Sequence, residues 1–381
     1  MELKKRYQFN VNFFRPGGRL YFRLAYHFRT KMMKLEKNKP YLILCNHTSN
    51  ADPCFVQLAF TRSIHFIAHY ELMASKMGRL VDHMFGIIPT MKGKVDLHGV
   101  RESMRIAKDN GVIGLFPSGD CTFSGVESPI DKSIVKYVRL IGADTILYRT
   151  FGLYGVDPRF SHKRRKGKAS GSVVRILTKE EIDKLSDDEL YKIIMDAINV
   201  NHYEELKEEL YRSNKKAEYL EQTLFVCPDC HNISSLQSNG NIIKCDNCGY
   251  KIEYQENLHL KLLSGKNGFD TILDWINFEK KELKKLGGDV KFSDDLKKIK
   301  VESKNRFDNF KGGHLELLNN KIVLSYGNKI IEFDIMKDKM ILHGKKRLVI
   351  YHEDDVYNLI GGNRFCGIKY IYYQESKVSE S

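Results

Sequence analysis

Four cysteines in two Cys-x-x-Cys pairs restrict how the region after residue 220 can fold. Cys227 and Cys230 form the first pair, and after a gap of 14 residues Cys245 and Cys248 form the second. We expect no secretory signal at the N-terminus, because no long apolar run follows its charges, and hence a reducing compartment. There the spacing predicts a metal site rather than two disulfides. Four thiolates complete a tetrahedral shell, so we predict a structural zinc, with a rubredoxin-type iron centre as the alternative.

The segment between the two cysteine pairs carries a hairpin signal, Ser-Asn-Gly-Asn, at residues 238–241. Gly249 directly follows the second pair, where a residue without Cβ lets backbone N–H groups approach sulfur. The segment therefore resembles a zinc ribbon, which we place at residues 223–255. So small a ribbon buries little apolar surface, and we expect metal binding to supply much of its folding free energy.

The region before the cysteines alternates between short apolar runs and amphipathic stretches. The runs predict buried strands at residues 41–45, 64–68, 111–116 and 173–177. The stretch 97–108 between them has helical periodicity, and the alternation as a whole predicts an α/β fold. Charged stretches at 180–198 and 203–220 predict two further helices. The second of these helices would make a helical linker of residues 201–222.

Residues 256–381 are predicted to form an accessory helix followed by a β-rich domain. The helix is expected over 268–290, and two strands, 321–326 and 329–335, flank a Gly-Asn turn that predicts a hairpin. Further strands are expected at 340–342, 347–351 and 367–373. This pattern resembles a small sandwich or barrel of pleckstrin-homology type, except that no closing C-terminal helix is predicted. The alternative is a domain that only packs against its neighbours.

A histidine and a carboxylate follow the predicted strand 41–45 directly. His47 should emerge in a loop at the edge of the sheet, where an imidazole is a suitable general base at neutral pH. Asp52, five residues on, can hold one ring nitrogen and leave the other for a substrate proton. An acceptor hydroxyl could then be activated without a nucleophile from the protein. Taken alone, such a pair more often has a structural role.

The run 46–53, Asn-His-Thr-Ser-Asn-Ala-Asp-Pro, resembles the HxxxxD motif of the glycerolipid acyltransferases, the lysophosphatidic acid acyltransferase-like family. Three further segments lie in the order that the family requires. They are Gly86–Lys92, Phe116–Thr122, which is similar to the family's Phe-Pro-Glu-Gly-Thr-Arg-Ser block, and Asp144–Leu147. The resemblance covers about residues 10–200, and we assign an acyltransferase domain to residues 1–200. It implies a mixed sheet flanked by helices, followed here by the zinc ribbon and the small mainly-β domain.

The resemblance implies transfer of a fatty acyl group from acyl-CoA or acyl carrier protein to the free hydroxyl of a lysophospholipid or 1-acylglycerol-3-phosphate. This reaction belongs to phospholipid synthesis or remodelling. His47 and Asp52 would be the catalytic pair, and backbone N–H groups near Gly119 could stabilise the developing oxyanion. The residues expected to bind substrate are Asn46, Lys92, Phe116, Pro117, Ser118 and Gly119.

Three residues depart from the family pattern. Lys92 and Cys121 stand where the family has arginine, and Ser118 stands where it has glutamate. Lysine keeps the charge but loses the bidentate fork that suits phosphate. A lysophospholipid with a larger headgroup therefore becomes a more plausible acceptor than lysophosphatidic acid. A catalytically altered, lipid-binding protein with the acyltransferase fold is the main alternative.

Positive charge is concentrated at the N-terminus. The chain has 62 Lys and Arg against 48 Asp and Glu, a net charge of +14, and half of it lies in residues 1–36. Apolar residues alternate there with arginines as in a helix that lies on a membrane surface. No apolar stretch is long enough to span a bilayer. We expect a cytoplasmic protein, peripheral on the inner face of the membrane. The ribbon has few basic residues, so no nucleic-acid partner is expected, and a zinc-ribbon nucleic-acid-binding protein is the lesser alternative.

Overall fold

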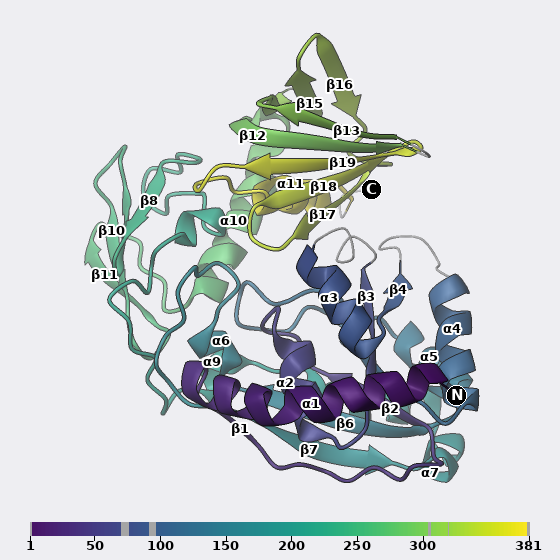
Figure 1. Ribbon diagram of the computed structural model, residues 1–381. Helices are drawn as coiled ribbons and strands as arrows, with labels where there is room; N and C mark the ends of the chain where they lie inside the picture. Colours follow the sequence, from purple (N-terminus) through teal and green to yellow (C-terminus); the bar gives the residue numbers. More distant parts are fainter. Residues whose placement is uncertain (1, 70–75, 91–96, 304–305, 319, 379–381) are drawn as a thin grey trace. The chain divides into compact units, whose positions relative to one another are not determined.

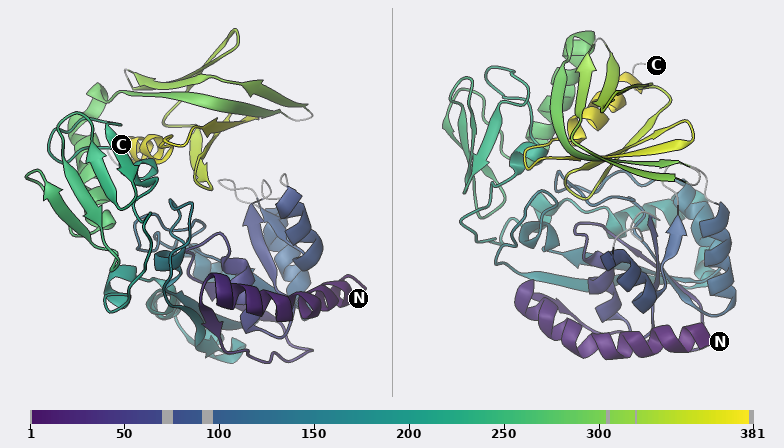
Figure 2. Two further views of the ribbon diagram at one scale, coloured as in Figure 1. Left: turned by 60° about the vertical axis from the view of Figure 1, so that its left-hand side comes forward. Right: turned by 45° about the horizontal axis from the view of Figure 1, so that its top comes forward.

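The computed structural model describes residues 2–69, 76–90, 97–303, 306–318 and 320–378. The chain forms two compact units. Unit 1 contains residues 1–158 and 164–211, and unit 2 contains residues 159–163 and 212–381. Figures 1 and 2 colour unit 1 from purple to teal and most of unit 2 from green to yellow.

A seven-stranded mixed sheet forms the centre of unit 1. Its strands, in chain order, are β1 (Phe28–Thr30), β2 (Tyr41–Cys45), β3 (His65–His69), β4 (Ile88–Thr90), β5 (Val112–Leu115), β6 (Asp144–Phe151) and β7 (Ala169–Leu177). Their order in the sheet is β1-β7-β6-β2-β5-β3-β4. Strands β2 to β6 are parallel to one another, whereas β7 runs antiparallel to β6 and pairs in parallel with β1. The predicted α/β class and mixed sheet are therefore confirmed.

Helices cover both faces of this sheet (Figure 1). They are α1 (Glu2–Ala25), α2 (Asp52–Ala59), α3 (Lys76–Phe85), α4 (Leu97–Lys108), α5 (Ser133–Ile141), α6 (Leu153–Val156), α7 (Lys179–Lys184), α8 (Asp187–Ile198) and α9 (His202–Glu205). Leu42 and Leu44 of β2 join one core with residues of α4, α5 and α8. Tyr41, Ile43 and Cys45 join the opposite core with residues of α2. Successive side chains of β2 point to opposite faces of the sheet, and both faces are buried. This explains why the sequence of the strand is apolar without interruption.

The helices after β7 differ from the prediction. The stretch 180–198 forms two helices, α7 and α8, and each begins with its own capping box, at Thr178 and at Ser186. The helix predicted over 203–220, and with it the helical linker 201–222, is wrong, because only α9 and a short 3-10 turn at Leu220–Gln222 form there. Ser213 accepts a hydrogen bond from a nearby backbone N–H, which competes with a continued helix.

The cysteine pairs of unit 2 lie in a small antiparallel sheet. Its strands are β8 (Leu236–Asn239), β9 (Ile242–Cys245), β10 (Lys251–Tyr254) and β11 (Leu260–Ser264), in the order β11-β10-β9-β8. The predicted hairpin turn connects β8 to β9, with Gly240 at φ +59°. The helix expected over 268–290 is α10 (Ile272–Leu286).

The rest of unit 2 is an eight-stranded antiparallel sheet with a terminal helix. Its elements are β12 (Phe292–Ser303), β13 (Arg306–Lys311), β14 (His314–Leu318), β15 (Lys321–Tyr326), β16 (Lys329–Phe333), β17 (Lys339–His343), β18 (Arg347–His352), β19 (Asp355–Gly361) and α11 (Ile368–Val378). The first part of the long strand β12 pairs with β14, and its second part pairs with β13 and β19. The predicted β15–β16 hairpin is present.

The strand predicted at 367–373 is wrong, because these residues begin α11. Tyr370 and Tyr373 are buried three positions apart, and Tyr372 and Ser376 are buried four positions apart, which is helical spacing. A closing C-terminal helix is therefore present, although its absence was expected and counted against a pleckstrin-homology-type fold.

Buried charges connect the parts of unit 2. Lys369 of α11 is 1% exposed, pairs with Asp294 of β12 at 2.7 Å and donates to Ser234 Oγ at 3.0 Å. In α10, Glu279 accepts from the backbone N–H of Val226 at 2.8 Å, and Trp275 Nε1 donates to the Val226 carbonyl at 2.9 Å. The segment leading into the first cysteine pair is thus fixed to α10.

Candidate active site and metal centre

The loops that carry the first and third sequence blocks meet at one edge of the sheet. His47 is the second residue beyond β2, and Phe116 is the first beyond β5. Because β2 and β5 are adjacent and parallel, both loops emerge at the same edge. The backbone N–H of Thr122 donates to the carbonyl of His47 at 3.1 Å, which connects the two loops directly.

His47 and Asp52 are in contact. Nδ1 of the ring lies 2.8 Å from Asp52 Oδ2, and the same oxygen accepts from the backbone N–H groups of Thr48 at 2.7 Å and Ser49 at 3.0 Å. Asp52 is the first residue of α2 and fully buried, whereas the His47 side chain is 17% exposed. Because Asp52 is buried and its Oδ2 has these three hydrogen-bond partners, it fixes the orientation of the His47 ring. Nε2 of the ring is then left for proton transfer.

The imidazole of His47 is held on its faces as well. Phe116 stacks on it with ring centroids 4.3 Å apart and planes inclined by 22°. Cys121 Sγ lies 3.5 Å from each of the two ring nitrogens, so the sulfur rests against the ring. Burial lowers the pKa of His47, but interactions with Cys121 and Asp52 outweigh this effect and hold the pKa well above its ordinary value.

Glu127 is a site residue that the sequence analysis missed. Its Oε1 accepts from the backbone N–H of His47 at 3.0 Å, and the side chain is 5% exposed. Burial raises the pKa of Glu127 to about 8, so the carboxyl is largely protonated at neutral pH. No sequence signal marks Glu127, because it lies in an irregular segment outside the four family blocks.

The other predicted site residues have varied positions. Asn46 is 1% exposed, and its amide bonds the backbone of Thr150 in β6, so it joins two strands instead of facing a substrate. Gly119 has φ +70°, but its N–H donates to the Phe116 carbonyl at 3.0 Å. This N–H already has a partner, so the predicted oxyanion site would have to use other backbone N–H groups near Gly119. Ser118 Oγ donates to the Asp120 carbonyl at 3.4 Å, and Lys92 lies outside the described residues.

An apolar groove begins beside this pair of loops. Pro117, the neighbour of Phe116, lines a cavity of about 300 Å³ between the ends of β3, β4 and β5 and the helices α4 and α5. Most of its lining side chains are apolar, among them Ile67, Val100, Leu115 and Ile134. Such a lining suits a hydrocarbon chain.

The four cysteines of unit 2 converge. Their sulfur atoms all lie within 4.8 Å of one another, with Cys227 and Cys248 3.6 Å apart and Cys230 and Cys245 3.7 Å apart. A tetrahedral ion with Zn–S bonds of about 2.3 Å requires sulfur separations of about 3.8 Å. All four cysteines are free thiols, so the arrangement fits a metal ion with four thiolate ligands.

Two parts of the chain match known protein families. Residues 27–148 match the model of the acyltransferase family, and residues 221–257 match a zinc-ribbon model described as the 7 kDa subunit of DNA-directed RNA polymerase. No curated protein matches the chain in sequence. Among solved structures, the chain is similar to a 1-acyl-sn-glycerophosphate (LPA) acyltransferase, PlsC, from Thermotoga maritima. The two share 16% identity over 49% of this chain and 76% of that one, with a TM-score of 0.39.

Residues 27–148 thus match the acyltransferase family that the sequence motifs resemble, and this range contains His47, Asp52, Phe116, Cys121 and Glu127. The four cysteines lie in a zinc ribbon, which was also predicted.

Proposed function

We propose that the protein is an O-acyltransferase of glycerolipids. It takes a fatty acyl group from acyl-CoA or acyl carrier protein and transfers it to the hydroxyl of a lysophospholipid or 1-acylglycerol-3-phosphate, in phospholipid synthesis or remodelling. The observation that carries this proposal is the 2.8 Å contact between His47 and Asp52 at the sheet edge, within the range that matches the acyltransferase family.

The chemistry follows from the two ring nitrogens. Nε2 of His47 accepts the proton of the acceptor hydroxyl while the oxygen attacks the thioester carbonyl carbon. Asp52, bound at Nδ1, stabilises the imidazolium that forms. The carbon–sulfur bond of the thioester then breaks, and the departing thiolate takes the proton from His47. The apolar groove at Pro117 accommodates the acyl chain.

The charges around His47 favour an acceptor without a terminal phosphate. Asp52, Phe116 and Cys121 contact the His47 ring, and Cys121 stands where the family has arginine. A phosphomonoester is normally held by arginine or lysine. A lysophospholipid with a larger headgroup therefore suits this site better than lysophosphatidic acid.

A donor and acceptor screen tests the function. The purified protein is incubated with labelled palmitoyl-CoA or palmitoyl acyl carrier protein and a set of lysophospholipids, with lysophosphatidic acid included. We expect a diacyl product with at least one lysophospholipid. Tight binding of lysolipid without product from any pair would instead identify a lipid-binding protein that has kept the fold and lost the reaction.

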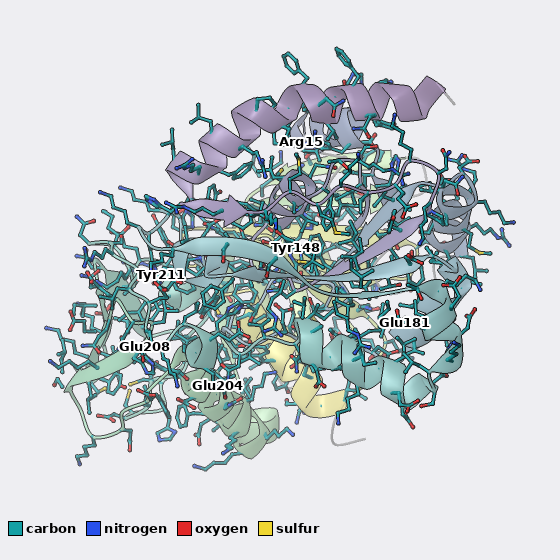
Figure 3. The ribbon with its side chains drawn as sticks, turned by 90° about the horizontal axis from the view of Figure 1, so that it is seen from below. Arg15, Tyr148, Glu181, Glu204, Glu208 and Tyr211 are labelled. Carbon is teal, nitrogen blue, oxygen red and sulfur yellow. The ribbon has the colours of Figure 1, made fainter. Side chains whose placement is uncertain are left out.

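The outer side of α1 supports the proposal that the substrate is taken from a membrane surface. Phe9, Phe13, Leu20 and Leu24 recur at helical spacing and are 70%, 80%, 60% and 68% exposed. The opposite side of the helix packs on the rest of unit 1, where Arg15 donates to the backbone carbonyls of Phe60 and Thr61 (Figure 3). No helix among the described residues is long and apolar enough to cross a bilayer.

Arginines accompany this apolar stripe. Arg19 and Arg23 of α1, with Arg29 of β1, line one surface groove of about 350 Å³. Apolar side chains that enter the interface beside cations are typical of helices on anionic membranes. We therefore propose that α1 binds an anionic lipid surface with this stripe.

Replacing Phe13 and Leu20 by serine should weaken binding to phosphatidylglycerol-containing vesicles at least about tenfold, since burying each such side chain contributes about 1.5–3 kcal/mol. Vesicle sedimentation measures the partition coefficient. Leu140→Ser is the matched control, because Leu140 is 49% exposed on α5, outside the stripe. Equal binding of the double variant and the control would contradict a membrane role for α1.

A further inference from the structure

Cys121 belongs to a cluster with His47 and Asp52 and is not an isolated thiol. Its sulfur lies 3.5 Å from Nε2 of His47, and the opposite nitrogen of that ring contacts Asp52. The next residue, Thr122, donates its backbone N–H to the carbonyl of His47 at 3.1 Å, which fixes Cys121 relative to the ring. Because Cys121 Sγ is also 3.5 Å from Nδ1, the sulfur lies over the ring face, and a small rotation would bring it to the Nε2 lone pair. Thiol, imidazole and carboxylate are the three groups that together activate a nucleophile.

The chemistry of a thioester donor makes such a thiol significant. The thiolate is the reactive form of cysteine, and an adjacent base that accepts the thiol proton produces it. Exchange of one thioester for another needs no further co-reactant, because the bond that forms and the bond that breaks are of the same kind. The sulfur now rests against the ring, and alignment with the Nε2 lone pair is expected to tighten when the donor binds.

Cys54 is a second thiol of unit 1, and it provides a comparison with Cys121. It lies in α2, two residues after Asp52, and burial raises its pKa to about 11. That thiol is protonated at neutral pH and a poor nucleophile. Cys54 therefore serves as a matched control in the same unit.

We infer that Cys121 is the first acceptor of the acyl group, so that an S-acyl-Cys121 intermediate connects the donor to the lipid hydroxyl; this inference rests on the proposed acyl transfer. Sγ of Cys121 attacks the donor carbonyl carbon while His47 Nε2 accepts the thiol proton. The donor carbon–sulfur bond breaks, and the donor thiol leaves with that proton.

The second half of the reaction restores the enzyme. His47 accepts the proton of the acceptor hydroxyl, whose oxygen attacks the carbonyl carbon of S-acyl-Cys121. The carbon–sulfur bond to Cys121 breaks, and the released thiolate takes the proton from His47. Since the donor departs before the acceptor reacts, the kinetics should be ping-pong, with parallel lines in double-reciprocal plots.

The experiment uses the full-length protein, alkyne-tagged palmitoyl-CoA and the corresponding N-acetylcysteamine thioester, first without an acceptor. We expect label on the Cys121 peptide in mass spectrometry, and neutral hydroxylamine should remove it because it cleaves thioesters. The label should be lost in Cys121→Ala and kept in Cys54→Ser. In Cys121→Ser, any label should resist hydroxylamine, because the adduct would be an oxyester. Unchanged melting temperatures establish that these variants fold.

Addition of lysophosphatidylcholine then decides the role of the adduct. We expect the label to pass from Cys121 to phosphatidylcholine at least as fast as steady-state turnover. Product formation without an adduct, with Cys121→Ala as active as the wild type, would overturn the intermediate and leave the proposed function intact. An adduct that lysophosphatidylcholine does not discharge would also overturn it. Neither product nor adduct with either donor would refute both proposals.

Discussion

Replacing His47 by glutamine is expected to lower kcat for acyl transfer by about 10²–10⁴-fold, the usual contribution of a general base. Glutamine can still donate a hydrogen bond to Asp52, but it cannot accept a proton from an attacking group. The fold should survive, because the carboxylate of Asp52 keeps its bonds to the backbone N–H groups of Thr48 and Ser49. Initial rates with the donor and acceptor pair found in the screen measure the effect. His83→Gln, an exposed histidine on α3, is the control and should retain wild-type activity.

The pH profile gives this prediction an independent readout. The base works only in its neutral form, so kcat/KM should rise with pH as His47 loses its proton. The pKa of His47 lies well above its ordinary value, despite the opposing effect of burial, because of Cys121 and Asp52. The acidic limb is therefore expected at higher pH than for a free imidazole, and Asp52→Asn should move it to lower pH. A His47→Gln protein that keeps full activity would refute the assignment of the base.

Removal of the metal from the cysteine cluster is expected to unfold the zinc ribbon and destabilise the rest of unit 2. A structural zinc with thiolate ligands contributes about 10–16 kcal/mol in small zinc modules, whereas whole domains are stable by about 5–15 kcal/mol. Because α10 holds the backbone of Val226 next to Cys227, loss of the cluster should also expose α10. Hydrogen exchange of the chelated protein measures both effects.

Cysteine variants separate the metal from side effects of the chelator. Cys227→Ser and Cys245→Ser should reproduce the loss of protection, whereas Cys54→Ser in unit 1 should not. Metal analysis of the untreated protein is expected to find stoichiometric zinc, and a coloured iron centre would select the alternative ion. Unchanged hydrogen exchange after complete removal of the metal would show that the ribbon does not depend on it.

The sequence predicted the parts of the fold in which a local pattern repeats. The strand Tyr41–Cys45 is apolar throughout because both of its faces are buried, and the loop after it carries the His47 motif. The cysteine spacing predicted the ribbon, because four ligands to one ion leave few arrangements of the chain. Both features depend on residues close together in the sequence.

The features that the sequence did not predict depend on contacts that a repeating local pattern does not reveal. Glu127 reaches His47 from a segment without a motif, and only the folded chain brings the two together. The tyrosines near residue 370 favour a strand by intrinsic propensity, but burial on one side of α11 decides for a helix. Residues 206–219 are charged as a surface helix would be, but Ser213 Oγ accepts from the backbone N–H of Lys215, which competes with the helical hydrogen bonds.

The buried pair of Lys369 and Asp294 affects how this chain can be divided experimentally or recombined in evolution. A fragment cut before α11 would leave Asp294 without its partner and Ser234 without its donor, and an unpaired buried charge costs several kcal/mol. The ribbon therefore cannot be treated as a cassette that is grafted or deleted independently. An expression boundary at residue 211 or 212 keeps Lys369, Asp294 and Ser234 in one polypeptide, although it removes residues 159–163 from unit 2.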